Sequence, residues 1–300
     1  MDNTVPGKRT LIVIAWVAML IVSDLPDILI TRLGGSPPVW LFWAKTGFLA
    51  LFVGLTLVWK VIRRLWQYAM VLLVLFLALG LTSLVRGTAW FQGNFNYKGV
   101  SFFTGYAAIM VLDIVVALTV IAALWFMKRD PTTFFMVKGR MDAPIEPTRW
   151  LGIKSGESWK VFGWIFTAAA GLAVFIPTIL GIAPTGETVL RALPLLPVAV
   201  LLAGVNAFTE ETYFRASLLS TLFEPIGKTH TLLITLVFFG LAHWLYGSPP
   251  GILGFLMTGF LAWLLARSML ETKGFLWPWI IHFVPDVVIF FSYALLFVQS

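Results

Sequence analysis

The sequence lacks cysteine entirely, and charged residues make up only 12% of its 300 residues. The absence of cysteine excludes disulfide-rich folds, cysteine-ligated zinc and thiol nucleophiles. Soluble domains carry about 25% charged residues, so this chain has too little charge to cover a water-exposed surface. Disordered chains are poor in aromatic residues, whereas 15% of this chain is Phe, Trp or Tyr. An integral membrane protein remains.

Long apolar runs recur along the chain, and about 20 apolar residues cross a bilayer as a helix. The runs do not alternate between apolar and polar residues, as the strands of a membrane barrel do. The sequence therefore predicts an all-α, polytopic membrane helix bundle of about eight to nine transmembrane helices. The candidate spans are Leu11–Ile30, Val39–Trp59, Gln67–Val85, Phe103–Met127, Val161–Ile182, Ala192–Phe223, Thr229–Gly247, Pro250–Leu270 and Phe275–Val298.

One long polar stretch interrupts these runs. It covers residues 128–160, contains Pro131, Pro144 and Pro147, and predicts a cytoplasmic linker. The linker separates a four-helix membrane region, residues 1–127, from a C-terminal domain, residues 161–300. We find no internal repeat, which counts against an inverted-repeat transporter.

The basic residues are distributed unevenly between the two sets of loops. With nine spans, one set contains only Arg32, Arg86, Lys98 and Arg191, and the other holds most of the remaining Lys and Arg. Cytoplasmic loops carry the excess of Lys and Arg, so we expect the N-terminus in the cytoplasm. The basic residues are not massed in one tract, so the net charge of +7 does not indicate a nucleic-acid partner.

Ionisable residues inside spans are costly and therefore informative. The N-terminal half contains Asp24, Asp27, Lys45 and Asp113. We expect Asp24 and Asp27 near the end of a span, close to water, and Lys45 to pair with Asp113. The interpretation favoured for this group is structural.

The C-terminal half contains a denser group of polar residues. Glu211 and Arg215 are four residues apart and therefore share a helix face, so Arg215 is expected to orient Glu211. Glu210 lies about 100° further round the helix and is the candidate for chemistry. His282 and Asp286 are also four residues apart and are expected to lie together.

The depth of these residues in the membrane can also be compared. The turn signal at residues 224–228 lies midway between Glu210 and His243. A helical hairpin there would place the two side chains at similar depth, and His282 follows a polar break at residues 271–274 on the same side. We therefore expect three helices to converge on one polar site below the cytoplasmic surface. His230 stands at a loop edge and is expected on the surface.

This set of side chains suits hydrolysis of an amide by an activated water. A Glu beside a His can accept a proton from water, and a second His with a polar partner can stabilise an oxyanion. Glu210, His243 and His282 are also a possible zinc ligand set, although no His-Glu-x-x-His motif is present. Each motif alone is more typical of a salt bridge or a packed histidine; the combination in one half of the chain indicates a functional site.

The ordered trio Glu-Glu-x-x-x-Arg, Phe-x-x-x-His and His-x-x-x-Asp resembles the CAAX protease and bacteriocin-processing family. These intramembrane endopeptidases include the type II CAAX prenyl proteases, and the resemblance covers residues 161–298. It implies that Glu210 is the general base with His243, and that Glu211 and Arg215 form an orienting pair. It also implies that His282 and the residue four positions later stabilise the oxyanion.

Asp286 departs from the family pattern, because this position is often Asn in prenyl proteases. An ionised Asp would repel an oxyanion. Asp286 is therefore protonated, or it orients His282, or the metal interpretation gains weight. The family has been described both as metalloprotease and as glutamate-type protease; we favour the version without a cofactor and keep zinc, held by Glu210, His243 and His282, as the alternative.

The resemblance implies an intramembrane endopeptidase that hydrolyses a membrane-associated or lipidated protein or peptide. We expect it in a plasma membrane of bacterial type, with the lipid bilayer and the substrate as partners and the site opening toward the cytoplasm. The alternative is a non-catalytic membrane binding or bacteriocin-immunity protein that keeps the fold. A proton-coupled transporter that uses the buried carboxylates ranks last.

Overall fold

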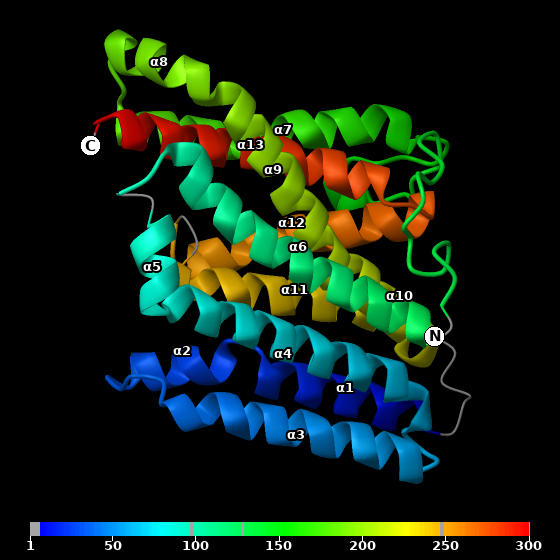
Figure 1. Cartoon of the computed structure of the whole chain (residues 1–300). Helices are drawn as coiled ribbons and strands as arrows, with labels where there is room; N and C mark the ends of the chain where they lie inside the picture. The colour runs from blue at the N-terminus through cyan, green and yellow to red at the C-terminus, as the bar shows by residue number, and fades with distance from the viewer. Residues whose placement is uncertain (1–6, 97–98, 128, 247–248, 300) are drawn as a thin grey trace. The chain divides into compact units, whose positions relative to one another are not determined.

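The computed structural model describes residues 7–96, 99–127, 129–246 and 249–299, which form helices joined by turns (Figure 1). Within these ranges the β-type pairs are two isolated bridges, Pro144 with Ser158 and Thr148 with Ile153. The all-α prediction is thereby confirmed. The helices are α1 Lys8–Val22, α2 Leu25–Arg32, α3 Val39–Val58, α4 Trp66–Gly87, α5 Ala89–Phe95, α6 Phe102–Phe126, α7 Trp159–Ile182, α8 Gly186–Ala192, α9 Leu196–Glu210, α10 Ser217–Ile226, α11 Lys228–Tyr246, α12 Ile252–Thr272 and α13 Leu276–Gln299.

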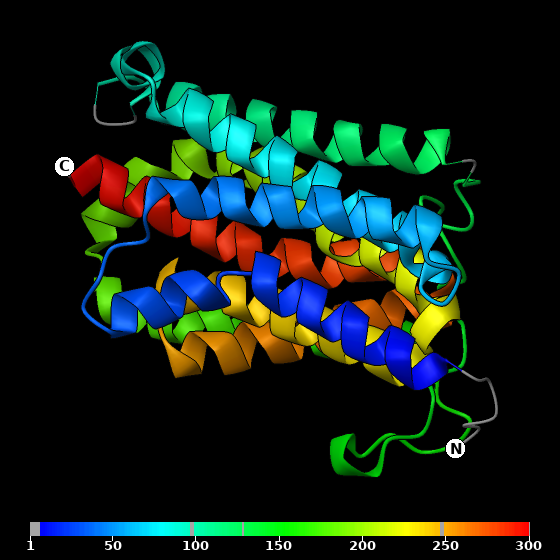
Figure 2. The same ribbon diagram turned by 90° about the horizontal axis from the view of Figure 1, so that it is seen from below.

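By length and composition, 7 helical stretches of the described chain can cross a membrane, or 8 if α1 and α2 form one broken span. These two helices are bent by 52° at their junction (dark blue in Figure 2). Pro26 stands at the start of α2, where it cannot continue the preceding helix. The predicted span Thr229–Gly247 corresponds to α11, which is helical but is not among the 7. The protein is an integral membrane helix bundle, and its described residues contain 7 or 8 candidate spans where about eight to nine were predicted.

The chain divides into two compact units. Unit 1 comprises Met1–Gly80, Thr119–Met136 and Thr212–Arg267, and unit 2 comprises Leu81–Leu118, Val137–Glu211 and Ser268–Ser300. Each unit therefore combines segments that are far apart in the sequence. The division of the chain into residues 1–127, 128–160 and 161–300 stays a prediction.

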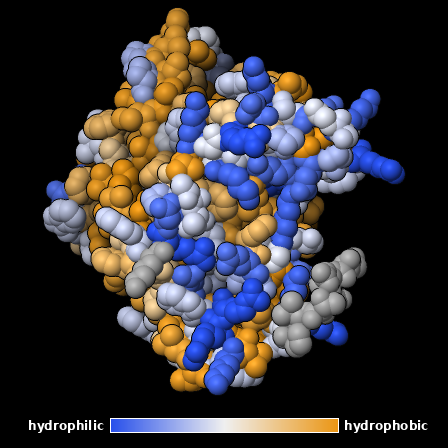
Figure 3. Space-filling model, turned by 90° about the vertical axis from the view of Figure 1, so that its right-hand side faces the viewer, coloured by the Kyte–Doolittle hydropathy of each residue, from blue (hydrophilic) through white to orange (hydrophobic). Residues whose placement is uncertain are grey.

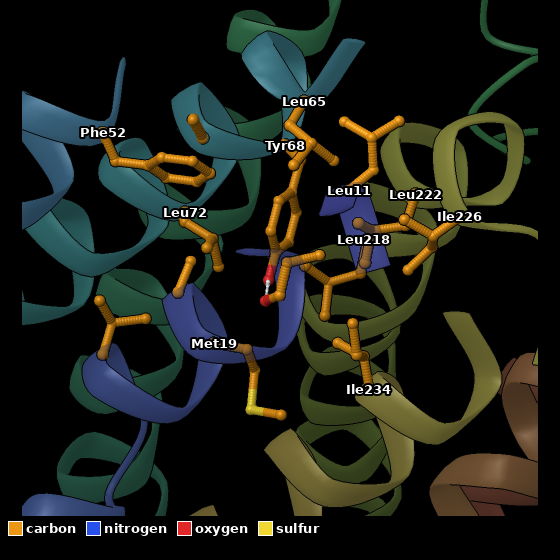
Figure 4. Close-up of a cluster of buried hydrophobic side chains, with 14 of the residues drawn as sticks. Leu11, Met19, Phe52, Leu65, Tyr68, Leu72, Leu218, Leu222, Ile226 and Ile234 are labelled. Atoms are coloured by element: carbon orange, nitrogen blue, oxygen red, sulfur yellow. Dashed lines mark hydrogen bonds between the residues drawn. The ribbon is translucent and has the colours of Figure 1, made fainter. Parts of the chain in front are cut away.

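The core of unit 1 forms around α1. Leu11, Ala15 and Met19 recur at a spacing of four residues and are buried, which is the pattern of one helix face. Figure 4 shows Leu11 and Met19 packed among side chains of α3, α4, α10 and α11. The hydroxyl of buried Tyr68 donates a hydrogen bond to the Ala15 carbonyl at 3.1 Å, so the polar end of this ring is satisfied within an apolar cluster.

The predicted turn between α10 and α11 is confirmed. Helix α10 ends at Ile226 and α11 begins at Lys228, with Gly227 at φ 83°, a left-handed conformation that favours glycine. Helices α10 and α11 pack against each other. His230 is not a simple surface residue, because it is only partly exposed and accepts a hydrogen bond from the Trp16 indole at 3.3 Å.

The predicted pairing of Lys45 with Asp113 is wrong. In unit 1 the Lys45 ammonium binds the Asp27 carboxylate at 2.5 Å and the Ser23 carbonyl at 2.8 Å. In unit 2, Asp113 forms an ion pair with Arg86. Lys45 and Asp113 therefore each have a partner of opposite sign within their own unit, which offsets the cost of burial.

Unit 2 is organised around α13, which packs against α7 and α9 (red beside green in Figure 1). The buried face of α7 carries Gly163, Thr167 and Gly171 at four-residue intervals. A Cβ at Gly163 would overlap the ring of Trp277, and one at Gly171 would lie 2.9 Å from Val284 Cγ1. Small residues of this kind let membrane helices approach closely, and here they seat the first half of α13.

The surface is divided between polar and apolar regions. Hydrophilic residues gather on the face that Figure 3 shows, and hydrophobic residues form its left margin. Large apolar side chains are exposed along candidate spans, such as Phe126 in α6 and Leu180 in α7. Such side chains suit contact with lipid rather than water.

Candidate active site

The first part of the candidate site lies where α9 ends. Glu210 is the last residue of α9, and Glu211 begins a π-helical turn, Glu211–Ala216. π-helical turns are rare and occur frequently at functional sites. A prediction based on regular α-helix spacing therefore does not apply unchanged from Glu211 onward.

Helix α13 supplies the second part. The Nδ1 of His282 lies 2.7 Å from Glu211 Oε1. Its Nε2 lies 3.6 Å from Glu210 Oε2 and 3.6 Å from Asp286 Oδ1. The structure therefore brings together four of the predicted site residues, with Glu210, Glu211 and Asp286 placed around the imidazole of His282.

The hydrogen bond between Glu211 and His282 fixes the role of each imidazole nitrogen. A carboxylate oxygen accepts, so Nδ1–H of His282 donates, and Nε2 is the nitrogen directed toward Glu210 and Asp286. A carboxylate on the far nitrogen orients the ring and stabilises its protonated form. Glu211 is therefore a positioning partner of His282, a contact over 71 positions that the local spacing did not predict.

Asn206 is a member of this group that sequence reasoning missed. Its side-chain amide donates to Asp286 Oδ2 at 3.0 Å. Asn206 stands four residues before Glu210 in α9, so the two share a helix face. A polar residue at that spacing inside an apolar run is the signal that could have identified it.

Exposure separates Glu210 from the rest of the group. Glu211 has no exposed surface, and His282 and Asp286 are 4% and 5% exposed. The side chain of Glu210 is 20% exposed. Glu210 is therefore the most accessible carboxylate of the group, while Glu211 and Asp286 are buried.

The remaining predicted residues, Arg215 and His243, belong to unit 1. The guanidinium of buried Arg215 lies 3.8 Å from the centroid of the Phe239 ring. His243 Nδ1 lies 2.9 Å from the Phe239 carbonyl, so Nδ1–H donates and Nε2 is the basic nitrogen of the neutral ring. Phe239 thus contacts both residues and is a positioning residue that sequence reasoning did not single out.

Two predicted relations concern residues of different units. The approach of Glu210 to His243 and the pairing of Glu211 with Arg215 both stay predictions. Each unit by itself contains a histidine whose ring is held by a hydrogen bond. His282 in unit 2 is oriented by the Glu211 carboxylate, and His243 in unit 1 is oriented by the Phe239 carbonyl.

A comparison with protein families identifies the segment that contains these residues. A family model described as type II CAAX prenyl endopeptidase Rce1-like matches residues 191–288. Residues 191–288 are similar to this family, and we call them the Rce1-like segment. The match runs from the end of α8 to the middle of α13 and includes Glu210, Glu211, Arg215, His243, His282 and Asp286.

The Rce1-like match confirms the resemblance drawn from the three motifs, and it supports a peptidase. A search of curated proteins and a search of solved structures gave no match. The helices before residue 191 lie outside the Rce1-like segment, so the match assigns them no role.

To bind a metal ion, several of these side chains would have to be arranged around one point. Among the described residues, no three His, Asp or Glu side chains are arranged so that they could hold one metal ion. The predicted zinc set joins His243 of unit 1 to Glu210 and His282 of unit 2, and it stays a prediction.

Proposed function

We propose that this protein is an intramembrane endopeptidase that hydrolyses a peptide bond of a membrane-associated or lipidated protein or peptide. The observation that carries the proposal is the group of Glu210, Glu211, His282 and Asp286 inside the Rce1-like segment. Ionisable groups inside a membrane are costly and mark function. Three carboxylates gathered around one imidazole are more than helix packing needs.

In this mechanism Glu210 is the general base, with His243 as its partner. Glu210 accepts a proton from a water molecule, and the hydroxide attacks the carbonyl carbon of the substrate. The same proton is then delivered to the leaving nitrogen as the carbon–nitrogen bond breaks, so the step is balanced without a further reactant. The partial exposure of the Glu210 side chain supports this role, because the base must meet water.

His282 stabilises the charge that develops on the substrate oxygen. With Nδ1–H bound to Glu211, the ring presents Nε2 to the site, and its protonated form donates a hydrogen bond to the oxyanion. Because Asn206 donates to Asp286 Oδ2, the carboxylate is held with Oδ1 toward His282. This contact supports the second of the three interpretations of Asp286, that it orients His282.

The proposal includes the location of the reaction. In the loops before α7, whose sides do not depend on whether α11 is a span, the basic residues are concentrated in one set, and the other set contains Arg32, Arg86 and Lys98. This excess supports a cytoplasmic N-terminus and, with it, a site that opens toward the cytoplasm. A peptide would then enter from the cytoplasm or laterally from the bilayer. A plasma membrane of bacterial type is part of the same proposal.

The test is cleavage of a reporter membrane peptide by the purified protein in liposomes. Wild type cleaves it, and Glu210→Gln and His243→Ala lower the rate by about 100-fold or more, the range expected for loss of a general base. The matched control is Glu187→Gln, which changes an exposed carboxylate of α8 in the same unit and leaves the rate unchanged. Normal cleavage by both site variants would overturn the mechanism.

The same preparation tests the zinc alternative and the non-catalytic alternative. Metal analysis of protein purified without chelators, followed by chelation, shows whether activity follows a bound metal; we expect that it does not. The non-catalytic alternative is motivated by Asp286 in place of the more usual Asn, and it predicts that the Glu210→Gln variant keeps the biological function. Loss of that function at unchanged expression would contradict the alternative.

A further inference from the structure

The segment between α6 and α7 is attached to unit 2 at the turn between α12 and α13. The amide of Arg140 donates to the Thr272 carbonyl at 2.7 Å, and the amide of Phe275 donates to the Val137 carbonyl at 2.8 Å. The indole of buried Trp277 donates to the Met141 carbonyl at 2.9 Å. Residues 137–160, which we call the anchor segment, are therefore an ordered part of unit 2 and not a loose connection.

A second attachment involves the carboxylate of Glu271. Its Oε2 accepts from the Trp159 indole at 2.9 Å and from the Glu146 amide at 3.3 Å. Trp159 is fully buried and begins α7. The anchor segment is thus held at the end of α12, the start of α13 and the start of α7, which are ends of candidate spans.

The middle of the anchor segment is a tight hairpin. Thr148 and Ile153 exchange two backbone hydrogen bonds of 3.0 and 3.2 Å, and Gly152 closes the turn at φ 71°, a conformation that favours glycine. Ile153 points inward and is 2% exposed, whereas Trp150 is 67% exposed. Figure 2 shows the short helical turn of this hairpin, in green, standing clear of the helices of unit 2.

The charge at this hairpin is of one sign. Residues 148–154 include exposed Arg149 and Lys154 and no acidic residue. The acidic residues Glu146 and Glu157 stand outside the hairpin, and the Glu157 carboxylate accepts from the Lys154 amide at 2.7 Å. The hairpin therefore combines an exposed aromatic ring with two cations on a rigid turn.

We propose that the anchor segment docks on the membrane surface, with Trp150 in the interface and Arg149 and Lys154 on anionic lipid headgroups. Tryptophan prefers the bilayer interface, and basic residues near it are attracted to anionic lipids. The chain from Lys154 to Trp159 spans at most about 18 Å when extended, so the hairpin is within reach of the headgroups at the start of α7. Docking also holds the first turn of α13, the helix that carries His282 and Asp286.

The absence of cysteine allows a direct test in the full chain. Leu151→Cys carries an environment-sensitive fluorophore beside Trp150, and Ser155→Cys, exposed on the same segment, is the matched reference. Both proteins are reconstituted in bilayers that contain phosphatidylglycerol and nitroxide-labelled lipid. The proposal expects strong lipid quenching at position 151 and weak quenching at position 155. In the Leu151→Cys protein, Arg149→Gln and Lys154→Gln each weaken docking by about five-fold.

Two results would overturn the proposal that the hairpin docks on anionic lipid. One is equal quenching at positions 151 and 155, and the other is quenching at 151 that is unchanged in neutral phosphatidylcholine bilayers. Since Arg149 and Lys154 are exposed, their variants keep the fold, and thermal unfolding of each variant confirms this. The readout does not use peptide cleavage, so the result is independent of the proposed function.

Discussion

The Lys45 ion pair of unit 1 and the His282 group of unit 2 bury their charges in different ways. In unit 1, Lys45 is bound to one carboxylate, that of Asp27. In unit 2, His282 lies within 3.6 Å of the carboxylates of Glu210, Glu211 and Asp286. A one-to-one pair neutralises the cost of burial, whereas several carboxylates around one titratable ring create a group that can move protons.

The comparison indicates which buried charges serve stability and which serve chemistry. Removing one partner of a neutral pair leaves an uncompensated buried charge, so folding suffers. Replacing one carboxylate of the His282 group by an amide changes the proton affinity of its neighbours more than it changes the packing. Variants of the ion pair should therefore lower the free energy of unfolding, whereas variants of the His282 group should lower the rate of cleavage.

After the loss of the general base Glu210 itself, the largest effect is expected from Glu211→Gln. The variant keeps the shape of the side chain but removes the charge on the acceptor of the His282 Nδ1–H hydrogen bond. Charge-assisted hydrogen bonds are about twice as strong as neutral ones, so we expect the cleavage rate per folded molecule to fall roughly 10- to 100-fold. Single-turnover kinetics and thermal unfolding of the same sample measure both quantities. A rate equal to that of wild type would show that Glu211 does not act through His282.

A smaller effect is expected from Asn206→Leu. Loss of the amide removes the donor to Asp286 Oδ2, and an unsatisfied buried polar group costs about 1–3 kcal/mol. We expect kcat to fall roughly ten-fold and KM to change little, because Asn206 acts through Asp286 and not on the substrate. The double variant Asn206→Asp with Asp286→Asn restores one amide–carboxylate pair. If the double variant is no more active than either single variant, positions 206 and 286 are not coupled, and Asn206 does not act through Asp286.

The smallest effect on cleavage is expected from Lys45→Met in unit 1. The free energy of unfolding should fall by about 2–3 kcal/mol, because Asp27 then stays partly buried without its cation. The cleavage rate per folded molecule should not change. Adding Asp27→Leu should recover most of the free energy of unfolding, since this second substitution removes the uncompensated charge. If the stability is not recovered, the pair of Lys45 and Asp27 is not what stabilises this part of unit 1.

The positions of most helices could be predicted from the sequence, because apolar runs about as long as a bilayer is thick report them directly. The turn between α10 and α11 was predictable for a similar reason, as Gly227 and its neighbours form a local signal. Long-range pairing was not predictable in this way. Lys45 was assigned to Asp113, but the partner in its own unit, Asp27, lies just beyond a helix break that its spacing could not reveal.

The candidate site shows the same limit. The residues Glu210, Glu211, His282 and Asp286 were found from their types and spacing, and the structure brings them together. The hydrogen bond from His282 to Glu211 was missed, because Glu211 begins a π-helical turn and its partner lies on another helix. The hairpin at Trp150 was not predicted, because a polar stretch with three prolines is typical of a linker. The ordered structure of residues 137–160 comes from contacts with residues 271–277, which the local sequence does not indicate.

The most direct test of the comparison is the single-turnover cleavage rate per folded molecule, measured for Glu210→Gln beside Lys45→Met. We predict a loss of about 100-fold or more for Glu210→Gln with unchanged thermal unfolding. For Lys45→Met we predict the wild-type rate with a lowered unfolding temperature. A Glu210→Gln protein that is folded and cleaves at the wild-type rate would contradict the central claim that the carboxylates around His282 form a peptidase site.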